Sequence, residues 1–77
     1  MNELEKIGYE KVADCGHGAG VYNKDNIYID ISRCGKEPRV EASIVFFYGT
    51  LPYDMTLTEM KACVEVMERM KSDGSLG

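Results

Sequence analysis

Several residue types are scarce in this 77-residue chain, which has no tryptophan, one histidine, two prolines and three cysteines. Three cysteines cannot all pair within one chain, so a complete disulfide framework is excluded. No apolar run approaches the ~20 residues that a membrane-spanning helix needs, so a membrane span is not expected. No charged segment followed by an apolar run opens the sequence, so we expect no secretion signal and reduced thiols in a cytoplasm.

A block of like charge is also missing. The chain has 9 basic and 13 acidic side chains, a formal net charge of -4, and these charges are spread along it. No basic patch for phosphate backbones is evident, so direct nucleic-acid binding is not expected. A double-stranded RNA-binding domain has a similar order of elements but needs a lysine cluster where its last helix begins. Here that segment, residues 58–61, contains one lysine, Lys61.

The remaining composition fits one small folded domain. Apolar residues make up 44% of the chain and charged residues 29%, which does not favour disorder. The pattern predicts a short helix over residues 1–8, an antiparallel β-meander of three to four strands over 9–48, and a long helix over 56–73. Residues 74–77 are expected to be a frayed tail. The predicted fold class is α+β, with the long C-terminal helix packed on the sheet.

Two capping boxes mark where the helices begin. Asn2 with Glu5 precedes the short helix, and Thr56 with Glu59 precedes the long one. After the second box, apolar side chains fill one half of the helical wheel, which is expected to pack on the sheet. These side chains are Leu57, Met60, Cys63, Val64, Val66, Met67 and Met70.

Alternation assigns the faces of the strands. Over residues 27–33, isoleucines alternate with mostly polar side chains, so one face is apolar and the other polar. Residues 39–48 form the strongest predicted strand, but its polar side turns apolar at Val45 and Phe47. Since one C-terminal helix covers one face only, the N-terminal helix, a second subunit or a partner must cover these two side chains. A homodimer is therefore one expectation. Residues 49–55 are expected to form a linker, because Pro52 interrupts strand pairing.

Four side chains have the chemistry of zinc ligands, but their spacing does not match a zinc knuckle, so no metal or cofactor is expected. They are Cys15, His17, Cys34 and Cys63. Cys15 and His17 also have the types of a nucleophile and its base, yet nothing in the sequence orients them. A chain of 77 residues leaves little room for a substrate pocket. We therefore expect no catalytic residues and no enzyme activity.

The glycine-rich run at residues 16–20 looks at first like a phosphate cradle. Such a cradle leads into a helix N-terminus, whereas this run leads into a predicted strand, so a hairpin connection is the simpler interpretation. If the chain binds a small molecule, this run is the expected ligand loop, formed by Gly16, His17, Gly18 and Gly20.

Tyrosines gather in the predicted sheet and just after it. Tyrosine on a sheet face suits a protein-binding surface, because it buries a large area at low entropic cost. The expected partner contacts are Tyr28, Asp30, Glu41, Tyr22 and Tyr48.

Two motifs carry a resemblance to known proteins. They are Ile7-Gly8-Tyr9-Glu10-Lys11-Val12 and Thr56-Leu57-Thr58-Glu59-Met60-Lys61. With its short opening helix, meander and capped closing helix, the chain resembles small proteins common in prophages and mobile elements of Gram-positive gut bacteria. Those proteins share a Leu/Ile-Gly-Tyr-x-Lys-Val stretch and a Thr-x-x-Glu helix cap. The glycine run and Cys34-Gly35 are not part of the shared pattern.

The resemblance implies a phage accessory protein in the cytoplasm of a bacterial host. Many proteins of this size from such elements inhibit host defence systems, anti-CRISPR proteins among them, and most act by binding. The expected function is therefore non-enzymatic inhibition of a host defence effector by protein–protein contact. Mild acidity suits a basic effector, because opposite charge steers association. The alternatives are a dimer that binds or sequesters a nucleotide signal and an assembly or regulatory component without inhibitory activity.

Overall fold

The computed structural model describes residues 2–16, 18–34 and 37–72, and within them the chain forms two helices and five strands. The strands lie in the order β1-β2-β3-β4-β5, and each pairs antiparallel with the next. The predicted α+β meander is confirmed, with five strands instead of three to four. The expected frayed tail lies outside the described residues. In chain order the elements are α1 (Glu3–Lys6), β1 (Glu10–Gly16), β2 (Ala19–Lys24), β3 (Ile27–Cys34), β4 (Glu37–Phe46), β5 (Gly49–Pro52) and α2 (Leu57–Ser72).

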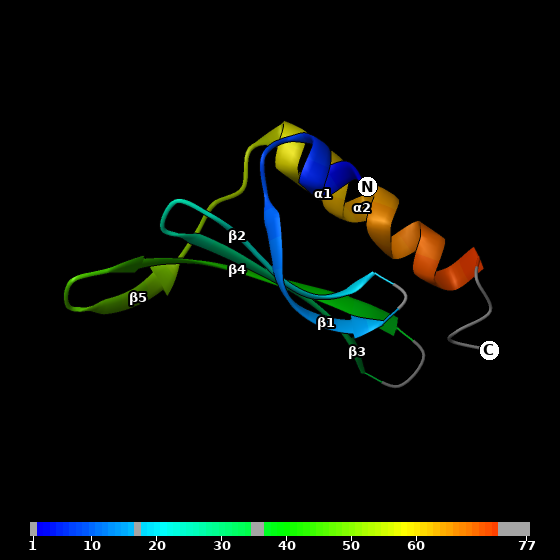
Figure 1. Cartoon of the computed structure of the whole chain (residues 1–77), viewed down its shortest axis with the longest axis horizontal. Helices are drawn as coiled ribbons and strands as arrows, with labels where there is room; N and C mark the ends of the chain where they lie inside the picture. The colour runs from blue at the N-terminus through cyan, green and yellow to red at the C-terminus, as the bar shows by residue number, and fades with distance from the viewer. Residues whose placement is uncertain (1, 17, 35–36, 73–77) are drawn as a thin grey trace.

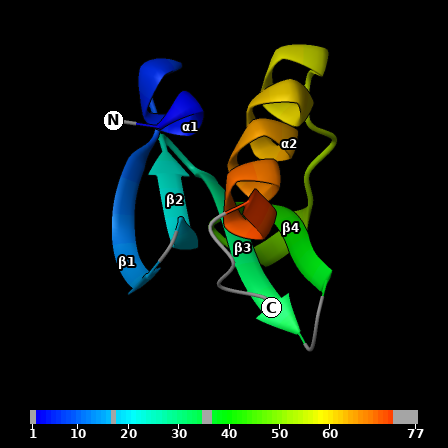
Figure 2. The same cartoon turned by 90° about the vertical axis from the view of Figure 1, so that its right-hand side faces the viewer.

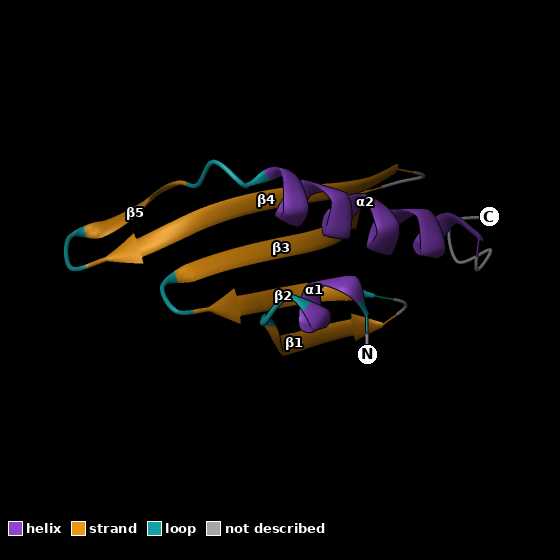
Figure 3. Cartoon of the chain, turned by 90° about the horizontal axis from the view of Figure 1, so that it is seen from above, coloured by secondary structure: helices purple, strands orange, loops and turns teal. Residues whose placement is uncertain are grey.

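Both helices lie on the same side of the sheet (Figures 1 and 2). Seen from above, α1 lies over β1 and β2, and α2 runs along β4 (Figure 3). An ion pair between Glu3 and Arg69 links the two helices. We call this side of the sheet the helix face and the opposite side the open face. Val45 and Phe47 were predicted to need a cover on the side of the sheet away from α2. Since α1 lies on the same side as α2, the N-terminal helix is excluded as that cover.

Both predicted capping boxes are present. Asn2 Oδ1 accepts from Glu5 N, and Glu5 Oε1 accepts from Asn2 N, each at 3.0 Å. At the start of α2, Thr56 Oγ1 accepts from Glu59 N at 3.2 Å, and Glu59 Oε1 accepts from Thr56 N at 2.8 Å. Each box gives partners to backbone N–H groups that have none inside the helix.

The core lies between the helices and the helix face. As the alternation predicted, Ile29 and Ile31 of β3 are fully buried, whereas Tyr28 and Asp30, which alternate with them, are exposed on the open face. A side-chain period of two along a strand produces this separation. The buried apolar residues are Leu4, Tyr9, Ala19, Tyr22, Ile29, Ile31, Ala62, Cys63, Val66 and Met70.

Helix α2 buries a narrower stripe than the sequence pattern indicated. Its fully buried positions follow helical spacing along one line of the helix, ending at Met70. By contrast Leu57, Met60 and Val64 are 64%, 44% and 51% exposed. The predicted packing of this helix on the sheet is confirmed, but these three apolar side chains lie outside the contact, because the sheet meets one line of α2 only.

The strand expected over residues 39–48 turns back early. It ends at Phe46, and after a tight turn the chain returns as β5, where a linker was expected. Pro52 fits because β5 is an edge strand. Tyr53 N donates to Ala42 O in β4 at 3.0 Å. Because backbone N–H groups alternate in direction along a strand, the nitrogen of Pro52 points away from β4, to the edge where no N–H is needed.

Candidate protein-binding surface

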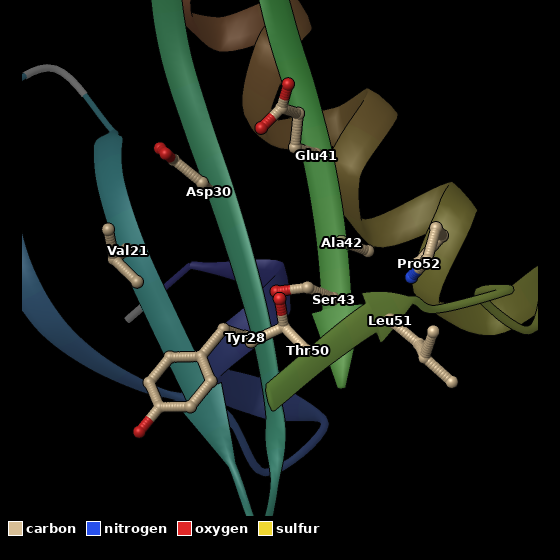
Figure 4. A pocket seen from close by; sticks show the side chains of 9 residues that line it. All are labelled: Val21, Tyr28, Asp30, Glu41, Ala42, Ser43, Thr50, Leu51 and Pro52. Carbon is tan, nitrogen blue, oxygen red and sulfur yellow. The ribbon is translucent and has the colours of Figure 1, made fainter. Parts of the chain in front are cut away.

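The open face carries three of the predicted contact residues. Tyr28, Asp30 and Glu41 are exposed there, on neighbouring strands β3 and β4 (Figure 4). The register brings them together, since Asp30 lies directly opposite Glu41 and Tyr28 directly opposite Ser43. Strand geometry therefore places a tyrosine, two carboxylates and a hydroxyl on one small area of the sheet.

These side chains border an open pocket of about 570 Å³. Its volume lies in the range of small-molecule sites, roughly 300–1,000 Å³. Strands β2 to β5 all contribute to it, so it lies across the middle of the open face (Figure 4). The lining residues are Val21, Tyr28, Asp30, Glu41, Ala42, Ser43, Thr50, Leu51 and Pro52.

Asp30 and Glu41 place two negative charges side by side in this pocket. Neither takes part in an ion pair with another described residue. The nearest basic position on this side of β4 is Arg39, two residues before Glu41. It lies opposite Ser32 and not opposite Asp30, so it does not separate the two carboxylates. Like charges at directly opposite positions destabilise a sheet. A cationic group from a partner would relieve this repulsion as well as attract both carboxylates.

Strands β4 and β5 form a hairpin that projects past the helices (Figures 1 and 3), and its residues Thr50 and Leu51 also line the pocket. We call residues 44–51 the finger; the register of β3 with β4 ends at its base, where Ile27 lies opposite Ile44. At the turn, Phe47 and Tyr48 are 94% and 89% exposed, with ring centroids 5.2 Å apart in an edge-to-face arrangement. Tyr48, predicted as a contact, therefore lies at the tip of the finger.

Sequence reasoning did not assign Phe46 and Leu51 to a binding surface, although both are exposed on the finger. A signal for the finger was present in the sequence, because residues 42–53 carry no charged side chain. An uncharged run that forms a projecting hairpin exposes apolar area that a small domain normally buries.

Tyr22 does not belong to the surface, and its assignment as a partner contact is corrected. Its side chain is fully buried among the core residues of the helix face. The hydroxyl donates to Gly18 O at 2.7 Å and accepts from Asn2 Nδ2 at 2.8 Å, and Lys11 Nζ lies 5.7 Å from the ring centroid. Buried tyrosines require such partners for their hydroxyl, so Tyr22 has a structural role.

The predicted ligand loop is mostly strand. Gly16 ends β1 and Gly20 is buried in β2, while His17 lies outside the described residues. Gly20 has φ +148°, and a Cβ added there would lie 2.1 Å from Ala13 O across a register shift between β1 and β2. Close approach of two backbones therefore explains this glycine without a ligand. A Cβ added at Gly18 would contact the buried side of α2, so close packing also explains this glycine without a ligand.

The two described thiols differ in exposure. Cys15 is exposed on β1, whereas Cys63 is buried in the core. Burial raises the pKa of the Cys63 thiol to about 11, so it stays protonated at neutral pH. Within the described residues no group of three or more His, Cys, Asp or Glu side chains is placed to hold a metal ion. His17 and the side chain of Cys34 lie outside them.

Glu59 is the buried carboxylate of the described chain. Besides closing its capping box, it accepts from the Tyr9 hydroxyl at 2.6 Å and from the Tyr53 hydroxyl at 2.9 Å. Burial alone would raise the pKa of Glu59, but these hydrogen bonds and those from Thr56 lower it below its usual range. An ionised carboxylate with this many donors stabilises the junction of sheet and α2, and it is not a proton donor at neutral pH.

Comparison with protein-family models, with curated proteins and with solved structures finds no match for this chain. Among the described residues, no helix is both long and apolar enough to span a membrane.

Proposed function

We propose that this chain is a non-enzymatic binding protein of phage origin that inhibits an effector of a host defence system in the bacterial cytoplasm. Its open face docks on a basic surface of that effector. The observation that carries the proposal is the direct pairing of Asp30 with Glu41 beside Tyr28, on a sheet face that no described helix covers.

The chemistry of this face fits a basic protein surface. Two adjacent carboxylates accept hydrogen bonds from a guanidinium group in a bidentate arrangement, and the ring of Tyr28 offers a face on which that group can stack. Effectors that act on nucleic acids carry basic surfaces for phosphate backbones. A protein that occupies such a surface with Asp30 and Glu41 competes with the nucleic acid, which gives inhibition without any chemical step.

The nucleotide-binding alternative is weaker. The pocket on the open face is large enough for a small molecule, but Asp30 and Glu41 would repel the phosphates of a nucleotide signal. The glycine run that was expected to wrap such a ligand is largely part of β1 and β2. The homodimer stays a prediction; if it formed through the open face, it would bring four carboxylates together.

A panel of bacterial strains, each carrying one defence system, tests the proposal. Phage plating is measured on each strain with and without this protein, and the systems include CRISPR nucleases and restriction enzymes. We expect plating to be restored against at least one system, and the purified effector to form a stable complex with the protein. If plating stays unchanged across systems whose effectors bind nucleic acids, the proposed function is wrong.

Two charge-reversed variants test the assigned surface in the same strains. Asp30→Lys with Glu41→Lys reverses the open-face pair, while Glu65→Lys with Glu68→Lys makes the same charge change on the exposed side of α2. We expect the first variant to lose inhibition and the second to keep it, with both folded by circular dichroism. Equal loss in both variants would mean that net charge acts, and not this surface.

A further inference from the structure

We propose that the finger inserts into an apolar cleft of the partner protein, at whose border basic side chains meet Asp30 and Glu41. The inference rests on the protein-binding role proposed above, but it does not require the partner to be a defence effector. It assigns to residues 44–51 the anchoring contact and to the open-face carboxylates the orienting contact.

The finger exposes side chains in three directions. On its helix-face side, Phe46 and Leu51 are 42% and 56% exposed, since the helices do not cover this part of the sheet. Thr50 is exposed on the other side, and Phe47 and Tyr48 project from the tip. A flat surface covers one side of a hairpin only. A cleft that encloses the finger covers both sides and the tip at once, and aromatic anchors in pockets dominate binding energies.

Charge argues for a protein cleft over a lipid surface. The uncharged run of residues 42–53 is flanked by Glu41 and Asp54, both acidic. Aromatic segments that dock on bacterial membranes carry lysine or arginine beside them, because the lipid surface is anionic. Acidic flanks oppose that approach, whereas they match a basic border around an apolar cleft of a protein.

A second copy of this chain is a poorer occupant than a cleft. A tip-to-tip contact would use Phe47 and Tyr48, which bury about 150–250 Å² each, so one tip offers about 300–500 Å² and two tips together about 600–1,000 Å². Stable interfaces bury about 1,200–2,000 Å² in total. Pairing of two β5 edges is also hindered, because Pro52 has no N–H to donate along that edge.

Site-specific crosslinking in the native bacterial host, followed by affinity measurement, tests the inference. A photoreactive phenylalanine analogue replaces Phe47 in one version of the protein and Val64 in another; Val64 is an exposed apolar side chain of α2 and serves as the control. The protein captured from position 47 alone is identified and purified. Its dissociation constant is then measured with the unmodified chain, with Phe47→Ser plus Tyr48→Ser, and with Val64→Ser.

We expect the double finger variant to bind at least about 30-fold more weakly, and Val64→Ser to bind as the unmodified chain does. Equal affinity of all three proteins would overturn the inference, as would the absence of any partner crosslinked from position 47. Crosslinking to a second copy would overturn it in favour of self-association. Finger-dependent co-sedimentation with phosphatidylcholine–phosphatidylglycerol vesicles would overturn it in favour of a membrane.

The same measurements separate this inference from the proposed function. A partner that needs the finger but has no part in host defence leaves the inference standing and refutes the proposed function. An inhibited defence effector whose affinity depends on Asp30 and Glu41, but not on Phe47 and Tyr48, supports the proposed function and refutes the insertion of the finger.

Discussion

Replacing Glu59 by glutamine tests how much one buried carboxylate stabilises this small fold. Its oxygens accept from the hydroxyls of Tyr9 and Tyr53 and from the backbone N–H of Thr56, which ties the α1–β1 and β5–α2 connections to the start of α2. In Glu59→Gln the side chain keeps its shape, but it loses its charge. One oxygen also becomes an NH₂ group that faces a donor where the carboxylate accepted.

The expected loss follows from the strength of the individual bonds. A hydrogen bond to a charged group contributes about 1.5–3 kcal/mol and a neutral one about 0.5–1.5 kcal/mol, so weakening the buried bond from Tyr9 costs about 1–1.5 kcal/mol. A domain of 77 residues has a free energy of unfolding of about 4–12 kcal/mol at typical values per residue. We therefore expect Glu59→Gln to lower the melting temperature by about 4–12 °C.

The stability that Glu59→Gln loses is expected to become smaller as the pH falls. The pKa of Glu59 is lower in the folded chain than in the unfolded one, so its contribution is complete at neutral pH and is lost as the pH falls through the folded value. The difference in free energy of unfolding between the unmodified chain and Glu59→Gln should therefore shrink between pH 7 and about pH 3.

Urea unfolding followed by circular dichroism at both pH values measures this difference. Glu68→Gln is the matched control, because Glu68 is exposed on the same helix, and its change should stay within about 0.5 kcal/mol. If Glu59→Gln behaves like this control, or if its effect is equal at both pH values, the role given to Glu59 is wrong.

Three further predictions concern the packing that supports the surface. Gly20→Ala should lower the free energy of unfolding by more than about 3 kcal/mol, while Gly49→Ala, at a similar φ of +141° but in open space, should cost about 1–2 kcal/mol; equal costs would contradict the clash. In the native protein iodoacetamide should label Cys15 rapidly and Cys63 only after unfolding, as peptide mapping would show; rapid labelling of both would contradict the burial. Tyr22→Phe should cost about 1–2 kcal/mol and leave partner binding unchanged, whereas weakened binding by the folded variant would return Tyr22 to the surface.

The sequence predicted those parts of the fold that local rules determine. Both capping boxes and the alternation of β3 depend on neighbouring residues, so they were readable without tertiary information. The length of β4 and the existence of β5 were not, because Pro52 is compatible with a strand only at an outer edge position. Strand order and register decide that position, and both arise from long-range pairing.

The candidate site was predictable to a similar degree. Clean alternation placed Tyr28, Asp30 and Glu41 on one exposed face, and the register shows how close they lie. Tyr22 was misassigned because the strand predicted to follow the glycine run is too short for its alternation to show which side faces the core. The uncharged run of residues 42–53 was visible in the sequence, but its exposure was not, since exposure depends on how far the helices extend over the sheet.

The dissociation constant of the purified effector complex decides whether Asp30 and Glu41 of the open face bind the effector. It is measured by calorimetry in one buffer for the unmodified chain, for Asp30→Lys with Glu41→Lys, and for Glu65→Lys with Glu68→Lys. We expect the open-face reversal to weaken binding by at least about 30-fold and the α2 reversal to leave it unchanged. Unchanged affinity after the open-face reversal, in a variant that remains folded, would mean that the open face is not the binding surface.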